Sequence, residues 1–358
     1  GYGIDRATRA PDMALAVNRA DLERPQTPSG VLGHLAAALA ARRAAGIAPF
    51  TVLSCDNLPG NGALLRDGLT AFARDLDPGL AGWIAENVAF PSSMVDRITP
   101  APTEATRLEA ERLTGCLDLA AVETEAFTQW VIEDDFRTGR PAWEAGGALF
   151  VKDVAPFEEM KLTMLNGSHT LIAALGVVAG LRLVRDAMAE PLVRALVARH
   201  LAAAGALLPA LPGMDRGDYA RALLSRFANP AIAHETRQIA MDASQKLPQR
   251  IFRPAMAALG RGRDVTPFAF ATAAWMRYTL GRDDEGRAFP LNDPREDEIR
   301  AAMAGAPGAD AAVLSGALHG LPGLIPTELA AASIWRDAIE RALARMLQGS
   351  VLVAVREE

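Results

Sequence analysis

The feature that most constrains the fold is a change of pattern at Pro156. Beyond this proline, apolar side chains recur with a helical period, and we find no strand-like segment between residues 156 and 345. Breakers such as Asn229-Pro230 separate the helical segments. The predicted helices cover residues 156–177, 189–206, 218–227, 231–243, 248–260, 266–280, 295–304 and 325–347. The sequence therefore predicts an all-helical domain over residues 156–358.

The residues before Pro156 have a mixed pattern. Short apolar, β-branched runs predict strands, and alanine-rich or charged amphipathic segments predict helices. The predicted strand segments are 49–55, 88–100 and 122–133, and the predicted helices are 31–45, 63–74 and 103–113. A strand, a polar loop and a helix in succession are the repeating unit of an α/β sheet. We therefore expect an α/β domain over residues 1–155, and the fold class is α/β plus all-α.

Composition excludes several classes of function. The 358 residues suffice for two domains, and a net charge of −6 gives no electrostatic footprint for nucleic acid. The longest apolar run, residues 170–181, is too short to cross a bilayer, so no membrane partner is expected. Two cysteines make no disulfide framework and suit a reducing cytoplasm. Five scattered histidines and the lack of a CxxC or HExxH pattern predict no metal site.

The first helix beyond Pro156 carries an unusual set of polar residues. At roughly 100° per residue, the side chains of Lys161, Glu158, His169 and Asn166 fall within an arc of roughly 140°. A solvated helix face would more usually repeat Glu, Lys and Arg. One amine, one carboxylate, one imidazole and one amide together suit the handling of a proton and an oxygen. From the pattern alone, an ordinary polar face remains the alternative.

A second polar group follows the predicted strand 49–55. Ligands in α/β folds bind beyond the carboxyl ends of the strands, where Asn57 and Asn61 lie in the sequence. Plain turn formation is the alternative explanation for both asparagines.

Three motifs, in the same order and over about 250 residues, resemble the long-chain mannitol dehydrogenase family. The string VAFPSSMVDRITP over residues 88–100 resembles the family signature, and KLTMLNGSH over residues 161–169 resembles its catalytic helix. SCDN over residues 54–57 resembles its asparagine loop. The family contains polyol dehydrogenases and hexuronate reductases that use NAD and no metal. The resemblance implies a Rossmann-type N-terminal domain followed by a helical C-terminal domain.

The resemblance also implies a role for each polar residue. It implies that Lys161 is the general acid/base and that Asn57 and Asn166 bind the reacting oxygen. It further implies that His169 holds a substrate hydroxyl and that Glu158 relays the proton to solvent. By the same resemblance, Asp96 lines the substrate pocket.

One departure from the family pattern concerns the cofactor. The chain opens at Gly1 without an initiator Met, and no GxGxxG motif occurs in it, so its cofactor-binding residues are unknown. About three-quarters of a family member is expected to be present. A different class of function, a non-catalytic helical fragment, stays open for a chain that lacks this turn.

The segment QIAMDASQKLPQR over residues 238–250 bears on the substrate. It is similar to the fructuronate reductase branch of the family. Lys246 and Arg250 are candidate partners of a substrate carboxylate, since arginine binds carboxylates through two parallel hydrogen bonds. We therefore expect an enzyme that interconverts D-fructuronate and D-mannonate with NAD, with mannitol 2-dehydrogenase as the alternative.

Overall fold

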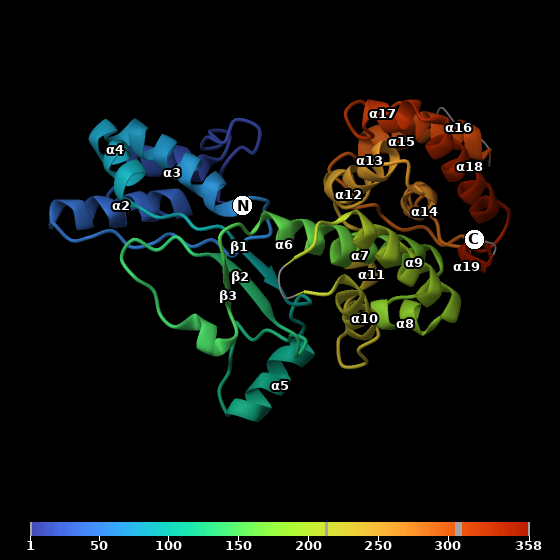
Figure 1. Cartoon of the computed structure of the whole chain (residues 1–358), viewed down its shortest axis with the longest axis horizontal. Helices are drawn as coiled ribbons and strands as arrows, with labels where there is room; N and C mark the ends of the chain where they lie inside the picture. Colours follow the sequence, from blue (N-terminus) through green and yellow to red (C-terminus); the bar gives the residue numbers. More distant parts are fainter. Residues whose placement is uncertain (1, 212–213, 305–309, 357–358) are drawn as a thin grey trace. The chain divides into compact units, whose positions relative to one another are not determined.

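The computed structural model describes residues 2–211, 214–304 and 310–356 (Figure 1). The chain divides into two compact units. Unit 1 comprises residues 1–97 and 127–158, and unit 2 comprises residues 98–126 and 159–358. The chain therefore enters unit 2 at residue 98, returns to unit 1 at residue 127 and enters unit 2 again at residue 159.

Unit 1 begins with four helices, α1 (Ala16–Glu23), α2 (Val31–Ala44), α3 (Asn61–Leu76) and α4 (Pro78–Asn87). The predicted helices at 31–45 and 63–74 are confirmed by α2 and α3. The patterns above did not predict α1 and α4. A local signal for α4 exists, because Pro78 occupies its first position and the Asp77 side chain accepts from Gly79 N at 2.8 Å.

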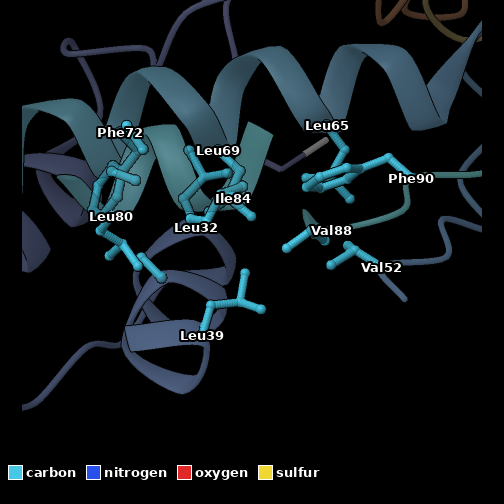
Figure 2. Packing of buried hydrophobic residues seen from close by; sticks show 13 residues of the cluster. Leu32, Leu39, Val52, Leu65, Leu69, Phe72, Leu80, Ile84, Val88 and Phe90 are labelled. Atoms are coloured by element: carbon cyan, nitrogen blue, oxygen red, sulfur yellow. The ribbon is translucent and has the colours of Figure 1, made fainter. Parts of the chain in front are cut away.

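Helices α2, α3 and α4 bury apolar side chains in one cluster (Figure 2). Each such side chain stabilises the fold by about 1.5–3 kcal/mol relative to an exposed one. The labelled members are Leu32, Leu39, Val52, Leu65, Leu69, Phe72, Leu80, Ile84, Val88 and Phe90. A Cβ on Gly62 of α3 would lie 2.3 Å from Phe90 O, so this close approach requires glycine.

The sheet of unit 1 has three short strands, β1 (Ser93–Asp96), β2 (Gln129–Glu133) and β3 (Leu149–Val151). β1 pairs antiparallel with β2, and β2 pairs parallel with β3. The predicted segment 88–100 contains β1. Only the end of the predicted strand 122–133 forms β2, and β3 follows the 3₁₀ helix η1 (Trp143–Gly146) without having been predicted.

The predicted strand at 49–55 is wrong. These residues form no strand, although Val52 N donates to Ala89 O at 3.0 Å. Val52 is buried in the cluster with Val88 and Phe90. The apolar composition of this segment therefore reflects burial against helices rather than pairing in a ladder.

Unit 2 is helical. Its elements begin with α5 (Glu104–Thr114), which confirms the predicted helix at 103–113 and is capped by Thr103 and Thr106. After α6 (Ala155–Met160) come the π helix η2 (Lys161–Asn166), α7 (Gly167–Val178), α8 (Val184–Ala189), α9 (Pro191–Leu207) and α10 (Arg216–Phe227). Then follow α11 (Thr236–Ala240), α12 (Ala243–Leu247), the π helix η3 (Pro248–Phe252), α13 (Arg253–Gly260) and α14 (Thr266–Tyr278). The last helices are α15 (Glu296–Ala304), α16 (Ala311–His319), α17 (Thr327–Ala331), α18 (Ser333–Gln348) and α19 (Val351–Arg356).

Two helices form the centre of unit 2. Every residue of α7 is buried, and α14 packs against both α7 and α18. Within the described part of unit 2 there are isolated bridges but no strand, as the sequence predicts, and the fold class is confirmed. The described residues include no helix long and apolar enough to span a membrane.

The predicted single helix at 231–243 is wrong. The helix in this region, α11, begins only at Thr236 and ends at Ala240. Asp242, whose φ is 55°, separates it from α12. This left-handed residue breaks the helix, and Asp is one of the few residues that adopt that conformation readily. Ala243, which begins α12, needs no left-handed backbone. The helices α8, α16 and α19 were also not predicted, and the predicted single helix at 325–347 is divided at Ala332 into α17 and α18.

Candidate active site

The polar helix that the sequence singles out contains a π turn. Residues Lys161–Asn166 form η2, between α6 and α7. A π turn widens the helix locally, so the 140° arc expected for a regular α-helix is not the observed arrangement. Lys161 and His169 are buried, and Asn166 is half-buried. Single π turns inside helices are frequent at functional sites.

The π turn packs against the second π segment of unit 2. η2 contacts η3, and Gly167, directly after η2, lies at the contact. A Cβ on Gly167 would lie 3.0 Å from Arg250 O and 3.0 Å from His200 Nε2. Glycine therefore lets the segment that carries Lys161 approach the segment that carries Arg250.

His169 occupies a buried, electropositive position in unit 2. Its ring contacts Phe227 with centroids 4.6 Å apart and His234 with centroids 5.4 Å apart. Burial lowers the pKa of His169 well below its usual value, and His234, Arg250, Arg226 and Lys161 lower it further. The imidazole is therefore neutral at pH 7 and has one N–H donor and one acceptor nitrogen.

The two cations of residues 238–250 also lie in unit 2. Arg250 Nη1 donates to Thr170 Oγ1 at 3.3 Å, and burial lowers the pKa of Arg250 to about 10. Lys246 Nζ donates to Ile239 O at 3.2 Å. Burial lowers the pKa of Lys246, and the charge of Arg250 lowers it further. Asp242 and Asp293 act on the pKa of Lys246 in the opposite sense, whereas burial alone lowers the pKa of Arg250. An anionic ligand beside Arg250 would favour its charged form.

The other three predicted residues belong to unit 1. Asn57 is exposed in the loop before α3, and its backbone N donates to Asp56 Oδ1 at 2.9 Å. Asp96 is buried at the end of β1. The Glu158 carboxylate accepts from Gly60 N at 3.1 Å, at the start of α3.

Asn61 holds the asparagine loop against β1. Asn61 is fully buried, and its Nδ2 donates to Asp56 O at 2.9 Å and to Ser93 O at 2.8 Å. Ser93 N donates back to Asn61 Oδ1 at 3.0 Å. The turn-forming role that the sequence allowed for the two asparagines therefore applies to Asn61, which fixes the loop against β1.

The structure thus brings together His169, Lys161 and Arg250, with Lys246 beside Arg250, in unit 2. The other three predicted residues, Asn57, Asp96 and Glu158, belong to unit 1. Sequence reasoning missed His234, which contacts His169 from a distant segment. No local pattern could have found it, because the two histidines meet only through the packing of α7 and the segment before α11.

Comparison with known proteins decides the family. The family model for the mannitol dehydrogenase Rossmann domain matches residues 3–145, and that for the mannitol dehydrogenase C-terminal domain matches residues 153–320. The chain belongs to the mannitol dehydrogenase family. The resemblance predicted from residues 54–57, 88–100 and 161–169 is confirmed.

Individual relatives agree with this family. The chain is 45% identical over 305 residues to the Escherichia coli (strain K12) protein named uncharacterized oxidoreductase YeiQ, covering 85% of the chain and 62% of that protein. It is 43% identical over 330 residues to D-mannonate oxidoreductase of the same strain, covering 92% of the chain and 67% of the relative. The chain thus spans less than two thirds of the length of YeiQ.

A solved structure matches the whole chain. The ternary complex of Pseudomonas fluorescens mannitol 2-dehydrogenase with NAD and D-mannitol aligns with a TM-score of 0.83 and 37% identity. The alignment covers 100% of this chain and 72% of the Pseudomonas fluorescens chain.

Proposed function

We propose that the protein containing this chain is an NAD-dependent oxidoreductase that interconverts D-fructuronate and D-mannonate. The observation that carries the proposal is the half-buried Arg250, whose guanidinium donates to Thr170 Oγ1 at 3.3 Å and whose pKa is lowered by burial to about 10. Among the described residues, Arg250 forms no salt bridge with a carboxylate, and Lys246 is near Asp242 and Asp293, which raise its pKa without forming a salt bridge to it. The similarity to D-mannonate oxidoreductase supports the same substrate.

A buried cation without a counter-charge has a preferred ligand. Removing a charge from water is costly unless the charge is paired, so a substrate carboxylate would stabilise Arg250 and Lys246. D-fructuronate carries a carboxylate at the end remote from its reacting carbonyl, and D-fructose has a neutral hydroxymethyl group there. A site built for a charge rejects the neutral analogue, because its own cations would stay buried and unpaired.

We assign the reaction steps to the residues of this chain as follows. When D-fructuronate is reduced, the Lys161 ammonium donates a proton to the carbonyl oxygen as hydride reaches the carbon. The side-chain amides of Asn57 and Asn166 donate to that oxygen as negative charge develops on it. His169 holds a substrate hydroxyl and Asp96 lines the pocket. Glu158 then passes a proton from solvent to restore the ammonium.

NAD supplies the hydride acceptor or donor when it is bound. The residues of this chain fit the substrate side of such a reaction but not the pyrophosphate side. The sequence contains no GxGxxG turn, and the Gly60 N–H at the start of α3 already donates to the Glu158 carboxylate. We therefore assign no residue of this chain to the cofactor phosphates.

The test is kcat/KM for NADH-dependent reduction of D-fructuronate and D-fructose by the full-length protein. We expect at least a tenfold preference for D-fructuronate, because the two cations pair with its carboxylate. Lys246→Met and Arg250→Met should each lose at least about tenfold on D-fructuronate and less than about threefold on D-fructose. The control is Arg253→Met, because Arg253 is exposed on α13 and its nearest carboxylate, Glu159, is 3.9 Å away.

Two results would decide against this substrate. Equal or better efficiency with D-fructose, or equal losses on both substrates in the variants, would reject the uronate. Mannitol 2-dehydrogenase activity would then be favoured, and the aligned complex with D-mannitol is the observation that supports it. Absence of turnover with either substrate would favour the non-catalytic helical fragment.

A further inference from the structure

A small cavity of unit 2 lies beside His169 and has no role in the steps above. Its polar lining comes from His169, Arg226, Asn229 and His234. Its apolar lining comes from Ile98, Val184, Phe227 and Ile232. The volume is about 10 Å³, which is room for about one group of the size of a water molecule or a hydroxyl.

Two imidazole nitrogens at this cavity lack partners. Among the residues that the structure describes, His169 Nε2 and His234 Nδ1 are buried and make no hydrogen bond. The two rings meet edge to face, with centroids 5.4 Å apart. A buried polar atom without a partner costs roughly 1–3 kcal/mol, so two of them at one cavity indicate a group that satisfies both.

The charge of the surroundings defines the chemistry of that group. Burial lowers the pKa of His234, and the charge of Lys246 lowers it further. Both imidazoles are therefore neutral at pH 7, each with one donor and one acceptor nitrogen. A hydroxyl matches this pair, because it can accept from one ring and donate to the other.

A carboxylate matches the cavity less well. The cation that lines it, Arg226, already donates from Nε and Nη2 to the buried Glu125 carboxylate, at 2.9 and 2.7 Å. Arg226 thus already has a buried carboxylate partner, whereas Arg250 forms no salt bridge with a carboxylate of the described residues. The carboxylate and the hydroxyl of one substrate would accordingly bind at different places in unit 2.

The backbone around His234 is fixed by hydrogen bonds to the turn after α7. Val184 N donates to His234 O at 3.0 Å, and Thr236 N donates to Arg182 O at 2.9 Å. The Thr236 hydroxyl also donates to Leu181 O at 2.9 Å. These bonds fix the main chain on both sides of His234, and none of them uses its Nδ1.

We infer that His234 is a substrate-recognition residue that binds, together with His169, one hydroxyl of a polyhydroxylated substrate chain. The inference rests on the proposed function, which supplies a sugar acid and its alcohol as the ligands. The hydroxyl contact is common to D-fructuronate and D-fructose, which differ only at the end that carries the carboxylate.

The experiment compares His234→Phe and His234→Asn in the full-length protein. Phenylalanine keeps the ring and removes both nitrogens, whereas the asparagine amide can replace Nδ1. We expect His234→Phe to raise KM at least tenfold for both substrates, with kcat changed less than about threefold. His234→Asn should raise KM less than about threefold. His319→Phe is the control, because His319 lies on α16 and its Nδ1 contacts Ser315 O at 2.8 Å.

The pattern across substrates separates this inference from the proposed function. A lost hydroxyl contact raises KM equally for D-fructuronate and D-fructose, whereas Lys246→Met should lower the efficiency with D-fructuronate far more than that with D-fructose. An unchanged KM in His234→Phe, with or without a lower melting temperature, would mean that His234 serves packing alone and would overturn the inference. If the wild type turns over neither substrate, calorimetric dissociation constants for D-mannonate and D-mannitol take the place of KM. No binding to the wild type, or an unchanged dissociation constant in His234→Phe, would equally overturn it.

Discussion

At the scale of single residues, positive charge dominates the site in unit 2. Lys161, Arg226 and Arg250 all lower the pKa of His169, and Arg226 also forms a buried ion pair with Glu125. The sequence could predict Lys161, Asn166 and His169 because one short helix carries all three. It could not predict His234 or the pairing of Arg226, since segments far apart in the chain bring them to His169.

Lys161→Ala tests the central assignment at this scale. Loss of the amine should lower kcat by about 10²–10⁴-fold, because no other group then transfers the proton in the transition state. The melting temperature and the NADH dissociation constant should change little. Steady-state kinetics with D-fructuronate and a cofactor titration provide the two measurements. Retention of kcat within about tenfold of the wild type would remove Lys161 from the general acid/base role.

At the scale of elements, helices were predicted better than strands. The period of 156–177 identified the helix that carries Lys161, but its π turn depends on packing against η3 and leaves no local signal. The strand at 49–55 was wrong because burial and strand pairing select the same apolar residues. Short strands such as β3 contain too few residues to show an alternating pattern.

Gly167→Ala tests whether the packing of η2 against η3 positions the site. The new methyl group would lie 3.0 Å from Arg250 O, so the two π segments must separate by tenths of an ångström. We expect kcat/KM for D-fructuronate to fall about tenfold, since small displacements of catalytic groups are costly. Gly205→Ala on α9 is the matched control, because its methyl group would make ordinary van der Waals contacts with the Met164 side chain at 3.5 Å and Arg216 Cβ at 3.8 Å. Equal effects of the two substitutions on kcat/KM would argue against a positioning role for this contact.

At the scale of the whole molecule, the order of an α/β part and a helical part follows from the change of pattern at Pro156. The assignment of residues 98–126 to unit 2 does not follow from that change of pattern. We call residues 98–126 the excursion. A buried ion pair holds this excursion, because Glu125 accepts from Ile98 N at 2.6 Å and from two nitrogens of Arg226 on α10. Such a long-range pair has no periodicity and cannot be identified from one sequence.

Glu125→Gln should therefore destabilise unit 2 while leaving unit 1 folded. Removing the carboxylate leaves the Arg226 guanidinium buried without a counter-charge, which costs about 3–5 kcal/mol. For a unit of this size the melting temperature should fall by roughly 6–20 °C. Calorimetry of the full-length protein measures the shift, and limited proteolysis should show earlier cleavage within 98–126.

Two variants serve as controls. Glu123→Gln changes an exposed carboxylate and should leave the melting temperature unchanged. The double variant Glu125→Leu, Arg226→Met should recover most of the loss, because it leaves no unpaired charge. A melting temperature within about 2 °C of the wild type in Glu125→Gln would show that apolar packing, not the ion pair, holds the excursion in place.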